Sequence, residues 1–237
     1  MRNSKSLLKM ITLSMLIALG VVISPILRVE GMCPMAHFIN IVCSVFLGPW
    51  YSLLCATLIG IIRMLTMGIP PIALTGAIFG AFLSGVFYRL SKGRIIFAVL
   101  GEIIGTGIIG AIMSYPVMTF LWGKEGLSWL FYVPSFICGT LIGGSIAYVF
   151  LRKVAANGML LKIQNMLGSK GYTDHSSLLS NTLTIASLGG ILFVVFELAT
   201  DIFALTAPLW DNMSYISLAV CGAAATIYYI TKKVKVN

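Results

Sequence analysis

The chain has 237 residues, of which 59% are hydrophobic and 10% are charged, and its mean hydropathy is +1.00. A soluble domain carries about a quarter charged residues, so this composition excludes a water-soluble protein and indicates one that crosses a membrane several times. The net charge of +9 comes from Lys and Arg in short segments between apolar runs, which we interpret as cytoplasmic loops rather than as a nucleic-acid surface.

The apolar runs are long and continuous, and they predict helices rather than the alternating strands of a β-barrel. The first run, residues 7–27, follows Arg2, Lys5 and Lys9 and superficially resembles a secretory signal. It is long for such a signal, and no small-residue cleavage pattern follows it. We therefore expect a retained first span that enters from the cytoplasm, followed by a short outside loop at 28–35.

The next apolar run, residues 36–62, is interrupted by Gly48-Pro49. If it formed one helix, the basic cluster at 89–94 would lie outside, whereas basic loops stay inside the cell. Proline breaks a helix and biases the preceding residue toward extended backbone. The sequence therefore predicts two short spans that turn at Gly48-Pro49-Trp50, although a re-entrant hairpin would satisfy the same charge rule.

Three further spans are expected at 72–90, at 95–121 and at 129–150, the second of them bent or ended near Pro116. The more polar segment 154–182 predicts a cytoplasmic linker with a partly amphipathic, interfacial helix.

Two more apolar runs, 183–205 and 214–230, predict a membrane tail. The predicted fold is thus an all-α polytopic membrane protein of the cell membrane with cytoplasmic termini. It comprises a six-helix domain (1–153), the linker (154–182) and a two-helix tail (183–237).

Small residues four apart recur in the predicted core spans, and such pairs let membrane helices approach closely. We interpret them as packing residues inside the bundle: Gly76 with Gly80, Gly101 with Gly105, and Gly139 with Gly143.

The sequence lacks the usual signatures of catalysis. It has no phosphate-binding loop, no His-Glu-x-x-His and no Gly-x-Ser-x-Gly, and its five cysteines have no metal-ligand spacing. We therefore expect no enzyme activity, no cofactor and no metal. A membrane-embedded enzyme and a structural or regulatory membrane protein remain the alternatives from other classes.

A sparse set of polar residues lies within the predicted spans, and intramembrane polar groups mark candidate functional sites. His37 and Asn40 are three residues apart and share a helix face. Arg63 lies near the outer end of its span and Glu102 enters from the inner side, so a direct ion pair between them is not expected. The predicted substrate-binding residues are His37, Asn40, Arg63, Thr75, Glu102, Ser114 and Tyr115.

Three motifs fall in order along the first two thirds of the chain: PMAHFINIVCSVFLGPWYSLLCATLIGIIR, LTGAIFGAFLSGVFYR and GEIIGTGIIGAIMSYP. Over residues 7–153 the chain resembles ThiW, the substrate-binding (S) component of energy-coupling factor (ECF) transporters assigned to the thiazole precursor of thiamine. The resemblance implies a six-helix S-component fold with an outward-facing pocket that is closed by the loop after the first helix.

The resemblance also implies partners, namely a transmembrane coupling subunit and two ATPases. Ser14 and Ala18 match the small-residue spacing with which S components dock on the coupling subunit. The implied substrate is hydroxyethylthiazole, a small heteroaromatic that suits apolar walls with few polar groups. Thiamine or its pyrimidine precursor is the alternative. Tyr115, Trp122 and Phe38 are candidates to stack on the ring, and His37 and Asn40 to meet its nitrogen and hydroxyl.

Overall fold

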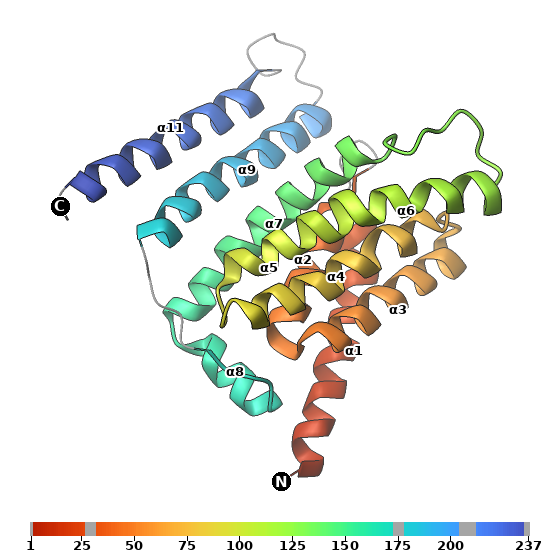
Figure 1. Ribbon diagram of the computed structural model, residues 1–237, viewed down its shortest axis with the longest axis horizontal. Coiled ribbons are helices and arrows are strands. Elements are labelled where there is room, and N and C mark those ends of the chain that lie inside the picture. The colour runs from red at the N-terminus through yellow and green to blue at the C-terminus, as the bar shows by residue number, and fades with distance from the viewer. Residues whose placement is uncertain (1, 27–31, 173–177, 204–211, 235–237) are drawn as a thin grey trace.

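The computed structural model describes residues 2–26, 32–172, 178–203 and 212–234, and these ranges are almost entirely helical (Figure 1). Six helical stretches within them are long and apolar enough to cross a membrane. The all-α polytopic architecture is therefore confirmed. The helices are α1 (Arg2–Ile26), α2 (Pro34–Leu47), α3 (Pro49–Met67), α4 (Ile72–Leu90), α5 (Ile95–Glu102), η1 (Ile103–Gly110), α6 (Ala111–Pro116), η2 (Val117–Leu121), α7 (Val133–Ala156), α8 (Met159–Leu167), α9 (Leu178–Phe203) and α11 (Met213–Val234).

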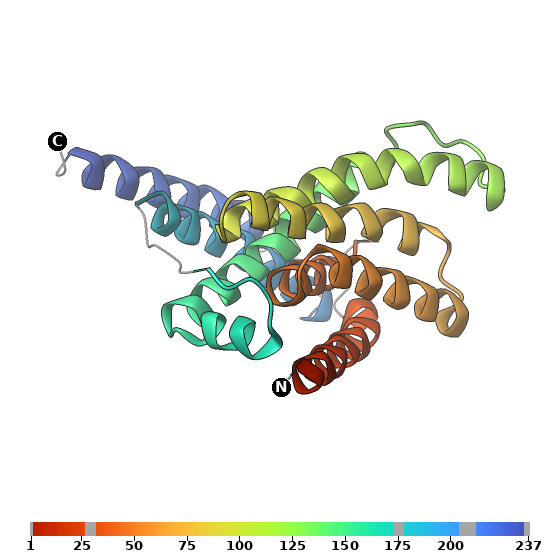
Figure 2. The same ribbon diagram turned by 60° about the horizontal axis from the view of Figure 1, so that its bottom comes forward.

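The longer helices form a row in which each packs against the next, in the order α11, α9, α7, the continuous stretch 95–121, α4 and α3. Beneath this row lies α2, which contacts α7, α4 and α3, and α1 packs in turn on α2 and α3 (Figure 2). Most of the 14 residues of α2 are buried, so this short helix is the centre of the bundle.

The predicted break after α2 is confirmed. Helix α2 ends at Leu47 and α3 begins at Pro49, with Gly48 between them at a φ of +93°. Glycine adopts this left-handed backbone at low cost, and the absent side chain also leaves room for the guanidinium of Arg89. The expected length of the second span is wrong, because α3 continues to Met67 and is 19 residues long.

The stretch 95–121 is one helical run that passes through Pro116 without ending. Two parts of it, η1 and η2, have the wider π-helical hydrogen bonding. Such wide turns accommodate local irregularity in a helix and often occur at functional sites. The first of them begins directly after Glu102.

The predicted interfacial helix corresponds to α8, which is anchored to the bundle by a buried amide. Gln164 is fully buried, and its Nε2 donates to the Val45 carbonyl at 2.9 Å and to the Tyr88 hydroxyl at 3.0 Å. Its Oε1 accepts from the Tyr172 backbone at 3.3 Å. Residues 159–172 are therefore part of the packed structure at the ends of α2 and α4.

The C-terminal helices α9 and α11 pack against each other, and α9 packs on α7 (Figure 1). Of these two, α11 is long and apolar enough to span a membrane by the described residues. The expected pair of additional crossings stays a prediction.

The glycine pairs lie where helices meet. A side chain at Gly101 or Gly105 would collide with the α4 backbone, and one at Gly143 would collide with the Pro34 carbonyl and lie 2.9 Å from Cβ of His37. Their interpretation as packing residues is confirmed, and the contact at Gly143 positions the start of α2 against α7.

We predict that Gly143→Ala lowers the free energy of unfolding by about 1–3 kcal/mol, because the added methyl group has no space between α7 and α2. Thermal unfolding of the purified protein in detergent measures the effect. Gly222→Ala is the matched control, since nothing lies within 4 Å of a side chain at Gly222. A Gly143→Ala protein as stable as the control would contradict the proposed tight contact.

Candidate functional site

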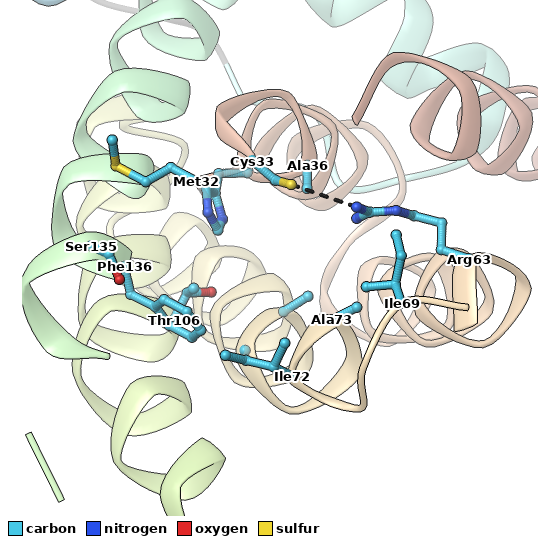
Figure 3. A pocket seen from close by; sticks show the side chains of 13 residues that line it. Met32, Cys33, Ala36, Arg63, Ile69, Ile72, Ala73, Thr106, Ser135 and Phe136 are labelled. Atoms are coloured by element: carbon cyan, nitrogen blue, oxygen red, sulfur yellow. Dashed lines mark hydrogen bonds between the residues drawn. The ribbon is translucent and has the colours of Figure 1, made fainter. Parts of the chain in front are cut away.

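A cavity of about 110 Å³ opens between α2, α3, α4, η1 and α7. It lies where α2, α4 and α7 begin and α3 ends, so it is at the opposite end of the bundle from the basic residues Arg89 and Lys153 in the last turns of α4 and α7. The lining residues are Met32, Cys33, Ala36, His37, Arg63, Ile69, Ile72, Ala73, Gly76, Ala77, Thr106, Ser135 and Phe136 (Figure 3).

The carboxylate of Glu102 lies directly behind one wall of this cavity and is fully buried. Its Oε1 accepts three hydrogen bonds, from His37 Nδ1 at 2.9 Å, from Asn40 Nδ2 at 3.0 Å and from Thr106 Oγ1 at 3.1 Å. A carboxylate accepts and does not donate, so the proton of the His37 contact belongs to Nδ1. Two of the three donors, His37 and Thr106, also line the cavity.

Local sequence spacing brings these groups together. His37 and Asn40 are three apart on α2, and Glu102 and Thr106 are four apart on the neighbouring helical run, so each pair shares a face. Gly80 completes the arrangement, because a side chain there would occupy the place of the Thr106 hydroxyl and lie 2.8 Å from Glu102 Oε2. That Oε2 is buried and has no hydrogen-bond partner in the described part of the chain.

Arg63 contributes a buried cation to another part of the cavity wall. Its side chain is 5% exposed, and its Nη2 donates to the Cys33 thiol at 3.5 Å, while Nε has no partner among the residues that the structure describes. Among the described residues, the short side-chain contact of Glu102 with a basic residue is to His37 and not to Arg63. The expectation that Arg63 and Glu102 do not pair directly is thus confirmed.

The other predicted residues lie farther from the cavity. Thr75 and Ser114 form a 2.8 Å hydrogen bond with each other, and Tyr115 packs against Trp129 with ring centroids 4.5 Å apart. None of these is among the residues that line the cavity. A role for them in substrate binding stays a prediction.

The proposed stacking residues also lie elsewhere. Phe38 packs edge-on against Phe150, and Trp122 is 53% exposed. The aromatic ring that lines the cavity is Phe136, which contacts Tyr132 at the start of α7. Burial raises the pKa of the Tyr132 phenol above its ordinary value, and the Tyr132 ring supports Phe136 by packing at a centroid distance of 5.9 Å.

Sequence reasoning missed Thr106, Phe136 and Cys33. A signal existed for Thr106, since it follows Glu102 by four residues and thus faces the same way. Phe136 is one of 13 phenylalanines, and nothing in its spacing marks it. The loop expected to close the pocket includes residues 27–31, which lie outside the described residues.

The arrangement has the features of a small-molecule binding site. The walls are mainly apolar, and the polar groups are hydrogen-bond donors and acceptors held by neighbouring side chains. In the described part of the chain, no three His, Cys, Asp or Glu residues are grouped in a way that would hold a metal ion.

Comparison with known families gives one informative result. A family model described as "Thiamine-precursor transporter protein (ThiW)" matches residues 10–157. Comparisons with curated proteins and with solved structures give no match. The matched segment includes every residue that lines the cavity as well as Asn40 and Glu102. The chain belongs to the ThiW family of thiamine-precursor transporter proteins.

Proposed function

We propose that this chain is the substrate-binding subunit of an ECF transporter and that it takes up hydroxyethylthiazole. The observation that carries the proposal is the small cavity inside the family-matched region, with apolar walls and a polar side anchored on Glu102. Binding sites for small molecules are typically apolar pockets with a few well-placed polar groups.

The cavity suits a small heteroaromatic molecule. Phe136 offers an aromatic face, Ile69 and Ile72 add apolar surface, and His37 and Arg63 supply polar contacts. The volume of about 110 Å³ favours a precursor ring over whole thiamine, which has two linked rings. The pyrimidine precursor remains the alternative substrate.

We assign direct contacts with the substrate to His37 and Arg63, because both line the cavity. Asn40 and Glu102 lie behind the wall and hold His37 in place through the carboxylate. Thr75, Ser114 and Tyr115 remain predicted substrate-binding residues, although they do not line the cavity.

Uptake also requires partners and an orientation. We propose that the cavity opens to the outside, since basic residues gather at the other end of α4 and α7 and basic loops stay in the cytoplasm. Ser14 and Ala18 are exposed on α1, which leaves them free to dock on a transmembrane coupling subunit. Two ATPase subunits would supply the energy for transport.

We predict that Glu102→Gln lowers the affinity for hydroxyethylthiazole about tenfold or more, because a neutral amide cannot hold His37 Nδ1, Asn40 and Thr106 as the carboxylate does. Calorimetry on the purified protein in detergent measures the dissociation constant. The wild-type protein must bind hydroxyethylthiazole more tightly than thiamine or the pyrimidine precursor.

Glu125→Gln is the matched control, since Glu125 is exposed in the loop before α7, and its affinity should stay within about twofold of wild type. Wild-type affinity in a folded Glu102→Gln protein would show that the carboxylate has no part in binding. If the protein instead bound another precursor tightly, the proposed substrate would be wrong, but the proposed class of transporter would stand.

We also predict that the tagged chain co-purifies from its native membrane with one coupling subunit and two ATPases. The complex with its partners is then reconstituted into vesicles. Uptake of labelled hydroxyethylthiazole into these vesicles should require ATP on the side where the ATPase subunits lie. Uptake by the chain alone, at the same rate and without ATP, would contradict the proposed ECF mechanism.

A further inference from the structure

The cavity carries opposite hydrogen-bonding character on two of its walls. His37 and Thr106 lie on the Glu102 side, and Arg63 lies beside Cys33 across the opening from Thr106 and Phe136 (Figure 3). We propose that this polarity fixes the direction in which the substrate binds. The inference rests on the proposed function, because it names which atoms of hydroxyethylthiazole form hydrogen bonds with each wall.

The Glu102 wall presents acceptors. His37 donates its Nδ1 proton to Glu102, and Thr106 donates its hydroxyl proton to the same oxygen. An imidazole that is protonated at Nδ1 keeps a lone pair on Nε2, and a hydroxyl whose proton is in use keeps its lone pairs. A ligand group that meets this wall is therefore complementary when it donates a hydrogen bond.

The Arg63 wall presents donors alone. A guanidinium has five N–H groups and no acceptor, and in this structure its partner is a thiol, which is a weak acceptor, at 3.5 Å. Within the described ranges the Nε–H is buried and has no partner, so it adds to the cost of burying this cation. A ligand acceptor that meets the part of Arg63 lining the cavity would replace the weak thiol contact with a stronger hydrogen bond.

Hydroxyethylthiazole has one hydrogen-bond donor, its hydroxyl, and one strong acceptor besides the hydroxyl oxygen, its ring nitrogen. The two walls therefore select one orientation. The hydroxyl points to His37 and Thr106, and the ring nitrogen points to Arg63. The side chain of Arg63 is thus a specificity-determining residue that requires an acceptor on the ring.

Two analogues separate the two contacts. The thiophene analogue replaces the ring nitrogen by C–H, and the 5-ethyl analogue lacks the hydroxyl. Dissociation constants of hydroxyethylthiazole and both analogues are measured on the wild-type protein, Arg63→Gln and Arg63→Lys. This design is a double-mutant cycle in which one partner is a ligand atom.

Each analogue should bind the wild-type protein about tenfold or more weakly than hydroxyethylthiazole. Arg63→Gln should weaken the binding of hydroxyethylthiazole and of the 5-ethyl analogue by the same factor, again about tenfold or more. It should leave the binding of the thiophene analogue unchanged or make it tighter. Arg63→Lys keeps the charge but not the planar guanidinium, so its affinity for hydroxyethylthiazole should lie between those of the wild type and Arg63→Gln.

The inference would be overturned if Arg63→Gln lowered the affinity for hydroxyethylthiazole and for the thiophene analogue by the same factor. It would also be overturned if the substitution left the affinity for the 5-ethyl analogue unchanged, since that result places the hydroxyl at Arg63. Absence of thiazole binding by the wild-type protein overturns the proposed function itself. Lys124→Gln, which removes an exposed cation outside the cavity, should change none of the three constants. Thermal unfolding verifies each variant, and Arg63→Lys carries the test if Arg63→Gln does not fold.

Discussion

The buried carboxylate of Glu102 is the constraint on which the rest of the structure depends. A charged group inside an apolar bundle is costly unless donors surround it. Here three donors converge on one oxygen, two from α2 and one from η1. Because the donors come from different helices, these hydrogen bonds join α2 to the stretch 95–121. Loss of the Glu102 carboxylate would remove the acceptor that His37, Asn40 and Thr106 share.

This constraint explains why α2 is short and central. For His37 and Asn40 to reach Glu102, α2 must lie close to the stretch 95–121. Gly143 leaves space for the start of α2 against α7, and Gly80 leaves space for Thr106 and Glu102 beside α4. The turn at Gly48 then ends α2 after 14 residues and directs α3 back toward the cavity. Arg63 thereby reaches the cavity wall from the last turns of α3.

Charge distribution and helix periodicity were sufficient to predict the helical class, the turn at Gly48 and the shared face of His37 and Asn40. They also predicted that Arg63 and Glu102 lie too far apart along the membrane normal to pair. They did not predict that Tyr115 packs against Trp129 away from the cavity. Depth along a helix follows from residue count, but rotation about the helix axis depends on packing and on local widening such as η1, neither of which the spacing of residues specifies.

The contribution of Phe136 was unpredictable for a related reason. Its position depends on how α7 packs against α2 and α4, where Gly143 lies close to the Pro34 carbonyl and Gly76 lies close to the Phe136 ring. Two of the aromatic residues expected to stack on the substrate lie elsewhere, because Trp122 is exposed and Phe38 packs against Phe150.

The family match ends at residue 157, yet the structure continues without a break in packing. Gln164 of α8 donates to the Val45 carbonyl, which belongs to the same helix as His37. A helix of 14 residues is about 21 Å long and moves nearly as a rigid body. Any displacement of α2 that changes the cavity must therefore also change the contact with Gln164. The cavity and the segment beyond the family region thus both contact one short helix, so α8 packs on the same bundle that holds the cavity.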